Sequence, residues 1–413
     1  MPSPPWPEAG GGGRRSRLSL PLKALLALAL PALLAGCGAS RDQQPAAGAA
    51  GVPVAAVIAL TGNGSAYGQD QRTGLRLALE AANAAGIQGT PLSLTIEDGA
   101  SDEPSAIAAF NLVIERGALA IIGPTLSQQA FAADPVAQRR GVPVLAPSNT
   151  ATGIPQIGSF ISRVSAQSSV IAPLSLDKAL TLQPGIRRVA VFFAQDDAYS
   201  TAETAIFQKA LAARGLTPVT VQRTQLADSD FQNQITATLR LNPDLVVLSM
   251  QAVDGGNLIR QLRELGYRGT IVVGNGMNTP NIYPICQRWC DGILIAQAYS
   301  PELDTPANRA FVAAFRKVQG GAAIPPQLTA QAYTALQVVS EALRRVARER
   351  PLASLPLVEA RKALNTAILS GTYQTPLGEI RFDPDGEVIQ KNFFVARVRM
   401  DPGGRSGRFE LLP

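Results

Sequence analysis

Hydroxyl-bearing residues follow strand-like segments at two points in the chain, and their positions suit the binding of an anion. Ser127 begins a predicted helix just after a strand that ends at Ile122, and Ser148 and Thr150 follow the strand 142–146. The exposed N–H groups of a helix N-terminus, together with nearby hydroxyls, favour an anion such as a carboxylate. Each hydroxyl taken alone is equally well explained as a simple helix cap.

Aromatic and acidic residues also follow predicted strands. Tyr67 comes after the first strand, and Asp197 and Tyr199 come after a strand that ends at Phe193. Ligands of open α/β sheets bind outside the carboxyl ends of the strands, so the acidic side chain of Asp197 could reach such a cleft. Half-buried surface tyrosines and a solvated acidic loop remain the alternatives.

The composition excludes several kinds of chemistry. The 413 residues include no histidine, which removes histidine triads, histidine bases and imidazole metal sites. No Ser-x-x-Lys stands in a convincing loop, and the acidic pair Glu97-Asp98 is adjacent, with its side chains pointing apart. No Gly-x-Gly-x-x-Gly follows a first strand, so we expect no nucleotide cofactor. The sequence therefore predicts a protein that is not an enzyme and that needs neither a cofactor nor a metal.

The positive charge is concentrated at the N-terminus. Residues 1–36 carry a net charge of +3, half of the chain's +6, and the remaining basic residues are scattered or lie on helix faces. Such faces are usually solvated, so we expect no nucleic-acid partner.

The N-terminal segment indicates export. Basic residues precede an apolar run over 22–34, which is shorter than the roughly 20 residues that span a bilayer and fits a signal peptide. The run ends in Leu34-Ala35-Gly36-Cys37, which resembles the bacterial lipoprotein cleavage motif. The resemblance implies a signal peptide over 1–36 and a lipid on Cys37. An ordinary cysteine after an ordinary signal peptide is the alternative.

Residues 37–51 are predicted to form a flexible tether, because they contain few apolar side chains that a folded core could bury.

Cys286 and Cys290 are the two other cysteines. An isolated local pair in an oxidising compartment predicts a disulfide, and two free thiols or a redox motif are the alternatives.

Strand and helix patterns alternate from Val52 onward, which predicts a doubly wound parallel sheet with right-handed crossovers. A second series begins near Arg187 and is followed by three helical stretches and a terminal strand pair. The predicted fold class is therefore α/β, with two doubly wound parallel-sheet lobes. The predicted segments are, in order, strands at 52–60, 92–97, 118–122, 142–146, 187–193, 217–224, 244–249, 270–273, 292–296, 378–382 and 391–399, and helices at 69–85, 104–116, 127–140, 199–214, 229–241, 255–265, 306–319, 328–348 and 357–370.

Motifs along nearly all of the mature chain resemble the type I periplasmic binding proteins, specifically the branched-chain and neutral amino acid receptors of ABC importers. The motifs that carry the resemblance are Leu60-Thr61-Gly62, Ala66-Tyr67-Gly68, Glu97-Asp98, Ile122-Gly123-Pro124 with Ser127, Val142-Pro143-Val144, Pro147-Ser148-Asn149-Thr150 and Asp197-x-Tyr199. The resemblance implies two flavodoxin-like lobes that are joined by three crossovers and close on a ligand. We expect a first lobe from 52–166 and 299–377, and a second from 167–298 and 378–413.

The resemblance also implies roles for individual residues. Ser127, Ser148 and Thr150 map to the positions that hold the α-carboxylate of the ligand, and Tyr67 and Tyr199 map to the aromatic positions that line the cleft.

The sequence departs from its relatives after the strand 270–273. Branched-chain receptors have an acidic residue there, whereas this chain has Gly274-Asn275-Gly276-Met277-Asn278. The family's second-lobe tyrosine falls near Gln251. An ammonium group would then be met by Asp197, by Asp254 or by neutral amide oxygens such as those of Gln251 and Asn275, because a buried cation without a partner is expensive.

The expected function is that of a lipid-anchored receptor of an ABC importer on the periplasmic side of a bacterial membrane. It would work as a monomer, capture an amino acid or similar small polar solute, and deliver it to a permease with its ATPase. The alternative is a sensing or regulatory lipoprotein of the same fold that binds an amide, urea or a small carboxylate, because fold alone does not fix function.

Overall fold

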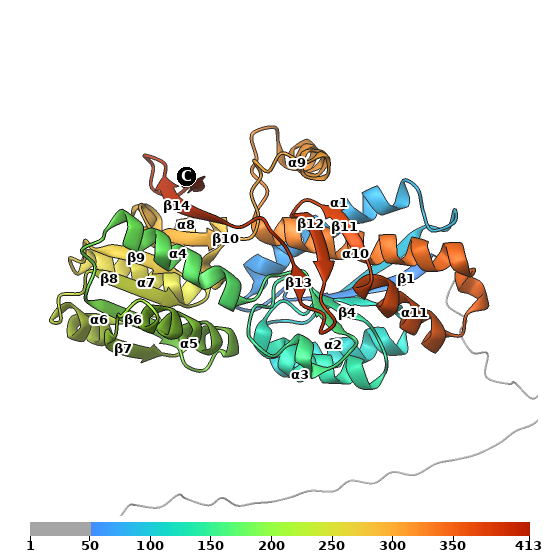
Figure 1. Ribbon diagram of the computed structural model, residues 1–413, viewed down its shortest axis with the longest axis horizontal. Coiled ribbons are helices and arrows are strands. Elements are labelled where there is room, and N and C mark those ends of the chain that lie inside the picture. Colours follow the sequence, from blue (N-terminus) through green and yellow to red (C-terminus); the bar gives the residue numbers. More distant parts are fainter. Residues whose placement is uncertain (1–50) are drawn as a thin grey trace, which may run out of the picture. The chain divides into compact units, whose positions relative to one another are not determined.

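The computed structural model describes residues 51–413, so the predicted signal peptide, Cys37 and the predicted tether up to residue 50 lie outside the described residues. The first lobe is built on a parallel sheet with the strand order β2-β1-β3-β4-β5 (Figure 1). β1 is buried on both faces along 55–58, as an apolar strand at the centre of a parallel sheet must be. The strands are β1 (Val52–Ile58), β2 (Leu92–Asp98), β3 (Ile121–Ile122), β4 (Val144–Ala146) and β5 (Ile161–Arg163).

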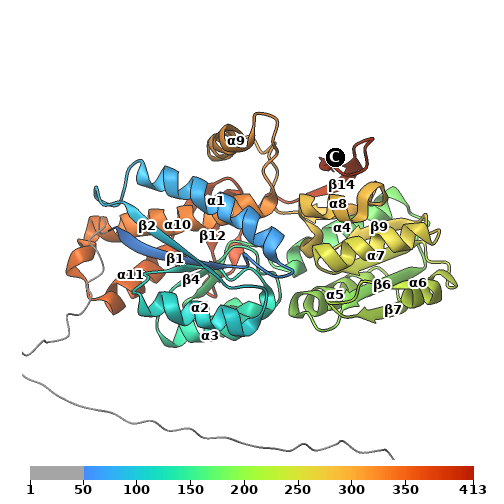
Figure 2. The same ribbon diagram turned by 180° about the vertical axis from the view of Figure 1, so that it is seen from behind.

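Helices cover both faces of this sheet (Figures 1 and 2). On one face α1 and α10 pack through residues such as Leu75 and Leu336, and on the other α2 and α3 pack through Phe110 and Ala130. α2 begins at a regular cap, because the side chain of Asp102 accepts the N–H of Ser105 at 2.8 Å. The helices of this lobe are α1 (Ser65–Asn83), α2 (Glu103–Glu115), α3 (Ser127–Arg139), α9 (Pro306–Gln319), α10 (Gln327–Glu349) and α11 (Leu357–Leu369), with short 3₁₀ turns η1 (Pro155–Ile157) and η5 (Leu352–Ser354).

The second lobe repeats the plan with the strand order β15-β14-β10-β9-β8-β6-β7. β6 to β10 are parallel, β14 pairs antiparallel with β10, and β15 pairs antiparallel with β14 at the edge of the sheet. The strands are β6 (Val189–Ala194), β7 (Pro218–Thr224), β8 (Leu245–Ser249), β9 (Thr270–Val273), β10 (Leu294–Gln297), β14 (Phe394–Met400) and β15 (Gly407–Leu411).

α4 and α5 pack on one face of the second sheet, and α6 and α7 pack on the other. The helical elements of this lobe are α4 (Ser168–Leu182), α5 (Ala198–Ala212), α6 (Gln232–Leu239), α7 (Ala252–Glu264) and α8 (Tyr283–Cys286), with 3₁₀ turns η2 (Asn275–Met277), η3 (Pro280–Ile282) and η4 (Gln287–Cys290). The predicted fold class is confirmed.

The chain crosses between the lobes after β5, after β10 and after a small third sheet. This sheet has the order β11-β12-β13, formed by β11 (Thr372–Thr375), β12 (Gly378–Phe382) and β13 (Val388–Ile389). The sequence placed the return to the second lobe at residue 378. In the structure β12 pairs with β11, and Ile380 and Phe382 join the first-lobe core, so the chain returns only at β14. The inward-facing side chains of β12 are apolar and are buried in the first-lobe core. β12 therefore stays in the first lobe instead of starting the return to the second.

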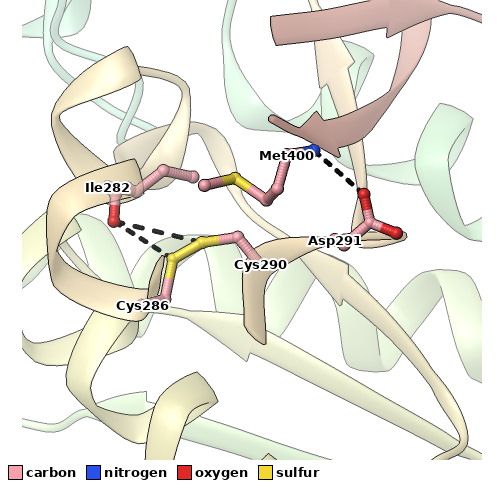
Figure 3. The surroundings of a disulfide bond; sticks show 5 residues. All are labelled: Ile282, Cys286, Cys290, Asp291 and Met400. Atoms are coloured by element: carbon pink, nitrogen blue, oxygen red, sulfur yellow. Dashed lines mark hydrogen bonds between the residues drawn. A yellow bond between two sulfur atoms is a disulfide. The ribbon is translucent and has the colours of Figure 1, made fainter. Parts of the chain in front are cut away.

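Cys286 and Cys290 are joined by a disulfide, with their Cα atoms 5.5 Å apart (Figure 3). Both cysteines are fully buried in the core of the second lobe, against which Met400 at the end of β14 also packs. The disulfide therefore closes a tight loop within the segment after η3. The next residue, Asp291, accepts the N–H of Met400 at the end of β14, at 2.9 Å. No helix among residues 51–413 has the length and apolar character needed to cross a bilayer.

Candidate functional site

The carboxyl ends of the strands of both lobes meet around a small hollow of about 30 Å³, here called the inner cavity. Seven of the eight residues that the sequence predicted as ligand contacts line it; Asp197 does not. The lining residues are Tyr67, Thr125, Leu126, Ser127, Ser148, Thr150, Tyr199, Gln251, Asn275, Gly276 and Leu328.

The first-lobe wall presents the N-terminus of α3. Ser127 is the first residue of this helix and is buried. Its hydroxyl oxygen accepts the N–H groups of Thr150 and Ala151, both at 3.3 Å, so the hydroxyl proton stays available to a ligand. The first-turn N–H groups of a helix lack intrahelical acceptors, and the helix dipole favours negative charge there. This wall is therefore suited to an anion.

The hydroxyls of Ser148 and Thr150 differ in their availability. Ser148 donates to the carbonyl of Thr125 at 2.6 Å and accepts the side-chain amide of Gln71 at 2.7 Å, so its proton is committed within the protein. Gln71 in turn accepts the hydroxyl of Thr125 at 2.6 Å. The hydroxyl of Thr150 makes no hydrogen bond within the described residues. Thr150 and Ser127 are thus the two first-lobe hydroxyls that can donate into the inner cavity, while Ser148 stiffens the wall.

Arg163 fixes the loop that carries Thr150. The guanidinium is fully buried and donates to the carbonyls of Asn149 and Ala151 at 3.1 and 2.7 Å, on either side of Thr150. It also forms a two-pronged ion pair with Glu387, at 2.8 and 2.7 Å. Glu387 lies between β12 and β13, just before the last crossover, so the ion pair connects the ligand loop to the segment that leads into the second lobe. No local sequence pattern marks either residue, because the two are 224 positions apart in the chain.

Tyr67 reaches from α1 across the cleft into the second lobe. Its hydroxyl accepts the N–H of Ala252 at the start of α7 and donates to the carbonyl of Gly276, each at 2.6 Å. Burial raises the pKa of Tyr67 well above its ordinary value, so it stays a neutral hydroxyl. Tyr67 therefore holds the two lobes together at one wall of the inner cavity.

Tyr199 of α5 belongs to the second-lobe wall, and Glu203 lies behind it, one turn further along the same helix. The hydroxyl of Tyr199 accepts the N–H of Gly276 at 2.6 Å and donates to Glu203 in a short hydrogen bond. The other carboxylate oxygen of Glu203 accepts the N–H of Asn275 at 3.1 Å. Burial raises the pKa of Glu203 to about 7, although the hydrogen bonds it accepts from Tyr199 and Asn275 lower it. The pKa of Tyr199 is also raised, first by burial and then by the nearby Glu203.

The packing of Glu203 explains why the loop 274–278 carries no carboxylate. A Cβ added to Gly274 would lie 1.6 Å from a carboxylate oxygen of Glu203, and one added to Gly276 would lie 2.7 Å from the ring of Tyr199. Any side chain at these two positions would displace α5. The carboxylate beside this loop is that of Glu203, which comes from α5. The sequence contains a signal for this carboxylate, because Glu203 lies four residues after the predicted cleft residue Tyr199 and so on the same helix face.

Asp197 and Asn275 are engaged by the protein itself. Asp197 caps α5 by accepting the N–H and the hydroxyl of Ser200 at 3.0 and 2.6 Å, and it accepts the amide of Gln251 at 3.1 Å. The side-chain oxygen of Asn275 accepts the amide of Gln327 at 3.1 Å. Gln327 begins α10, so this hydrogen bond is a second link between the lobes.

Over residues 51–413 no group of three or more histidine, cysteine, aspartate or glutamate side chains is placed to hold a metal ion. The inner cavity combines anion-binding donors on one wall with neutral hydroxyl, amide and apolar groups on the other. The inner cavity is therefore suited to a small solute with an anionic end.

Comparisons with known proteins agree with this geometry. The model of a family described as periplasmic binding protein matches residues 51–405. The leucine-, isoleucine-, valine-, threonine- and alanine-binding protein of Pseudomonas aeruginosa is 25% identical over 353 residues, which cover 85% of this chain and 90% of that protein. A Leu/Ile/Val-binding protein of Rhizobium johnstonii is 25% identical over 352 residues, covering 83% and 90%.

Solved structures share the fold. A leucine-binding protein from Thermotoga maritima superimposes with a TM-score of 0.77 at 26% identity, covering 87% of this chain and 97% of that one. A branched-chain amino acid transporter substrate-binding protein from Streptococcus pneumoniae, in complex with isoleucine, gives 0.76 at 20% identity, covering 88% and 99%. The second likeness is one of fold alone.

Proposed function

Because the chain belongs to the type I periplasmic binding proteins of the branched-chain amino acid family, we propose that it captures an amino acid or a similar small polar solute between its lobes and delivers it to the permease of an ABC importer. Members of this family are solute-binding proteins, not enzymes, and work outside the cytoplasm. The proposal includes a monomer held at the periplasmic face of a bacterial membrane by a lipid on Cys37.

One observation carries the proposal: the N-terminus of α3, with Ser127 and Thr150 beside it, faces the inner cavity. Its donors are fixed by Arg163 and by the network of Gln71, Thr125 and Ser148 before a ligand arrives. Donors that are already in place bind a carboxylate without a further ordering cost. The remaining walls, with two tyrosines, Leu126 and Leu328, suit a small organic body attached to that carboxylate.

The ligand is tested with the soluble chain from residue 52 onward. A panel of amino acids, amides, urea and small carboxylates is screened by thermal shift, because a ligand that binds only the folded state raises the melting temperature. We expect stabilisation only by ligands that carry a carboxylate, followed up by calorimetry for the dissociation constant.

Ser127→Ala tests the site. Removing a hydrogen bond to a charged group is expected to weaken binding by about 10- to 100-fold. Ser340→Ala is the matched control, because Ser340 is also buried and its hydroxyl donates to the carbonyl of Gln337 at 2.9 Å within α10, away from the cavity. Equal binding by Ser127→Ala and wild type, or stabilisation by amides without a carboxylate, would contradict the proposal.

Transport is separated from sensing by uptake of the labelled ligand into cells. Deletion of the gene should abolish high-affinity uptake, and the full chain should restore it. A chain with Cys37→Ser should be processed differently and be released from the membrane fraction. Unchanged uptake in the deletion strain would favour the sensing alternative.

A further inference from the structure

A second hollow of about 460 Å³ adjoins the inner cavity and is called here the mouth chamber. Both lobes contribute to it: the first through the loop 61–64 and residues 100–102, the second through Asp197, Leu226 and the start of α7. It shares Tyr67, Leu126 and Gln251 with the inner cavity, so these three side chains form the partition between the two spaces.

Two carboxylates of the mouth chamber are buried. Asp197 is 1% exposed and Asp254 is 2% exposed, and both line the chamber. One oxygen of each, Oδ1 of Asp197 and Oδ2 of Asp254, is buried without a hydrogen-bond partner. A buried carboxylate oxygen without a partner is expensive, and such groups in native structures call for an explanation.

No side-chain cation of the chamber balances these two acidic groups. Its lining contains no lysine and no arginine, and its one further acidic residue, Asp102, caps α2. Burial, with a contribution from the nearby Asp197 and Asp196, raises the pKa of Asp254 to about 8. A cationic group in the chamber would stabilise the ionised form of both side chains.

The partition determines which part of a ligand could reach these carboxylates. Ser127 and Thr150 line only the inner cavity, whereas Asp197 and Asp254 line only the mouth chamber. An α-ammonium group lies two bonds from the carboxylate carbon and stays in the inner cavity with it. A cation in the mouth chamber must therefore sit at the far end of the ligand, beyond Tyr67 and Gln251.

We propose that the mouth chamber is a second subsite, in which Asp197 and Asp254 bind a distal ammonium or guanidinium group of a ligand whose carboxylate is held at the N-terminus of α3. This inference rests on the proposed function and narrows it to carboxylates with a cationic far end, such as basic amino acids or ω-amino acids. The cation supplies the partners that the two orphan oxygens lack.

Four ligands with the same six-carbon chain separate the two charges: hexanoate, 6-aminohexanoate, norleucine and lysine. Their dissociation constants are measured by calorimetry on the chain from residue 52 onward. The terminal ammonium is expected to tighten binding at least about tenfold in both pairs, lysine over norleucine and 6-aminohexanoate over hexanoate. Raising the salt concentration should reduce that advantage only slightly, because the chamber carboxylates are buried.

Asp254→Asn and Asp197→Asn test the assignment. Each should reduce the advantage of the terminal ammonium to about threefold or less in both ligand pairs; Asn can still cap α5 at position 197. Glu264→Gln is the matched control, because it removes one charge from the exposed far end of the same helix as Asp254.

The outcomes are distinguishable. If norleucine binds as tightly as lysine, or if Asp254→Asn and Glu264→Gln act alike, the mouth-chamber subsite is overturned while the amino acid receptor stands. If no carboxylate in the series or in the wider panel binds, the proposed function itself fails, and this subsite fails with it.

Discussion

The hydroxyl of Tyr67 in the first lobe donates to the carbonyl of Gly276 in the second, at 2.6 Å and across 209 positions of sequence. The same hydroxyl accepts the N–H of Ala252. One side chain thus satisfies a backbone donor and a backbone acceptor of the opposite lobe, beside the inner cavity and on the partition to the mouth chamber. Tyr67 therefore connects the two lobes directly.

Tyr67→Phe should favour the open arrangement of the lobes. The substitution leaves the N–H of Ala252 without its acceptor, which costs about 1–3 kcal/mol in the closed form. We expect weaker ligand binding by roughly 5- to 100-fold and a larger radius of gyration in small-angle X-ray scattering at subsaturating ligand. Tyr267→Phe is the control, because the hydroxyl of Tyr267 is buried and donates to the carbonyl of Thr270 at 2.9 Å within the second lobe alone. Equal ligand affinities of the two variants would rule out the interlobe role.

Glu203 should make the folded chain less stable as the pH rises. Burial raises its folded-state pKa to about 7, above the ordinary 4.5, so the folded state keeps a proton that the unfolded state releases. Its stabilising contribution is complete below about pH 4.5 and is lost as the pH rises through about 7, by roughly 1–3 kcal/mol. Asp70, with a pKa raised to about 7 by burial, acts in the same direction.

Denaturant unfolding of wild type and Glu203→Gln between pH 5 and 8 measures this contribution. The free energy of unfolding of Glu203→Gln should fall less over this range than that of wild type. Glu80→Gln, on the exposed face of α1, should follow the wild-type profile. Parallel profiles for Glu203→Gln and wild type would show that Glu203 titrates normally.

Glu387→Gln should lower both stability and ligand affinity. The variant leaves the buried guanidinium of Arg163 without its charge partner, which typically costs about 3–5 kcal/mol. The loop around Thr150 should loosen as well, because Arg163 holds the carbonyls on both sides of it. The ligand dissociation constant should rise even at temperatures where the variant is fully folded by circular dichroism.

The exposed pair of Arg214 and Asp177 is the matched control, with 25% and 51% of its side chains exposed. Asp177→Asn should change stability by less than about 1 kcal/mol and leave ligand binding unchanged. Loss of stability in Glu387→Gln without any change in affinity would limit the role of the ion pair to folding.

Reduction of the disulfide should have a small effect. Cys286 and Cys290 are four positions apart, so the loop that they close is short and the entropy that the bond removes from the unfolded chain corresponds to about 2 kcal/mol. Adding a reductant during chemical unfolding should lower the free energy of unfolding by about that amount. The double variant Cys286→Ala/Cys290→Ala should show no further response to the reductant. A response in the double variant would point to a different cause.

Local sequence patterns determined most of the secondary structure and one wall of the site. The apolar run of β1 predicts a strand that is buried on both faces. The start of α3 at Ser127 is likewise predicted by the residues immediately around it. Ser127, Ser148 and Thr150 could be found for the same reason, since each follows the carboxyl end of a strand. α4 was missed, because Pro173 lies inside it and the proline signal argues against a helix unless the packing of Leu176 and Ala179 on the second sheet outweighs it.

Only the tertiary structure decided which distant groups meet. The carboxylate beside the loop 274–276 is Glu203 of α5, the guanidinium behind Thr150 pairs with Glu387, and β12 stays in the first lobe because its apolar face completes that core. These choices depend on burial and on satisfying charges between segments that are far apart in the chain. A local pattern specifies a helix face or a strand, whereas the partner of a buried charge is fixed by how two lobes pack, and no short stretch of sequence contains that information.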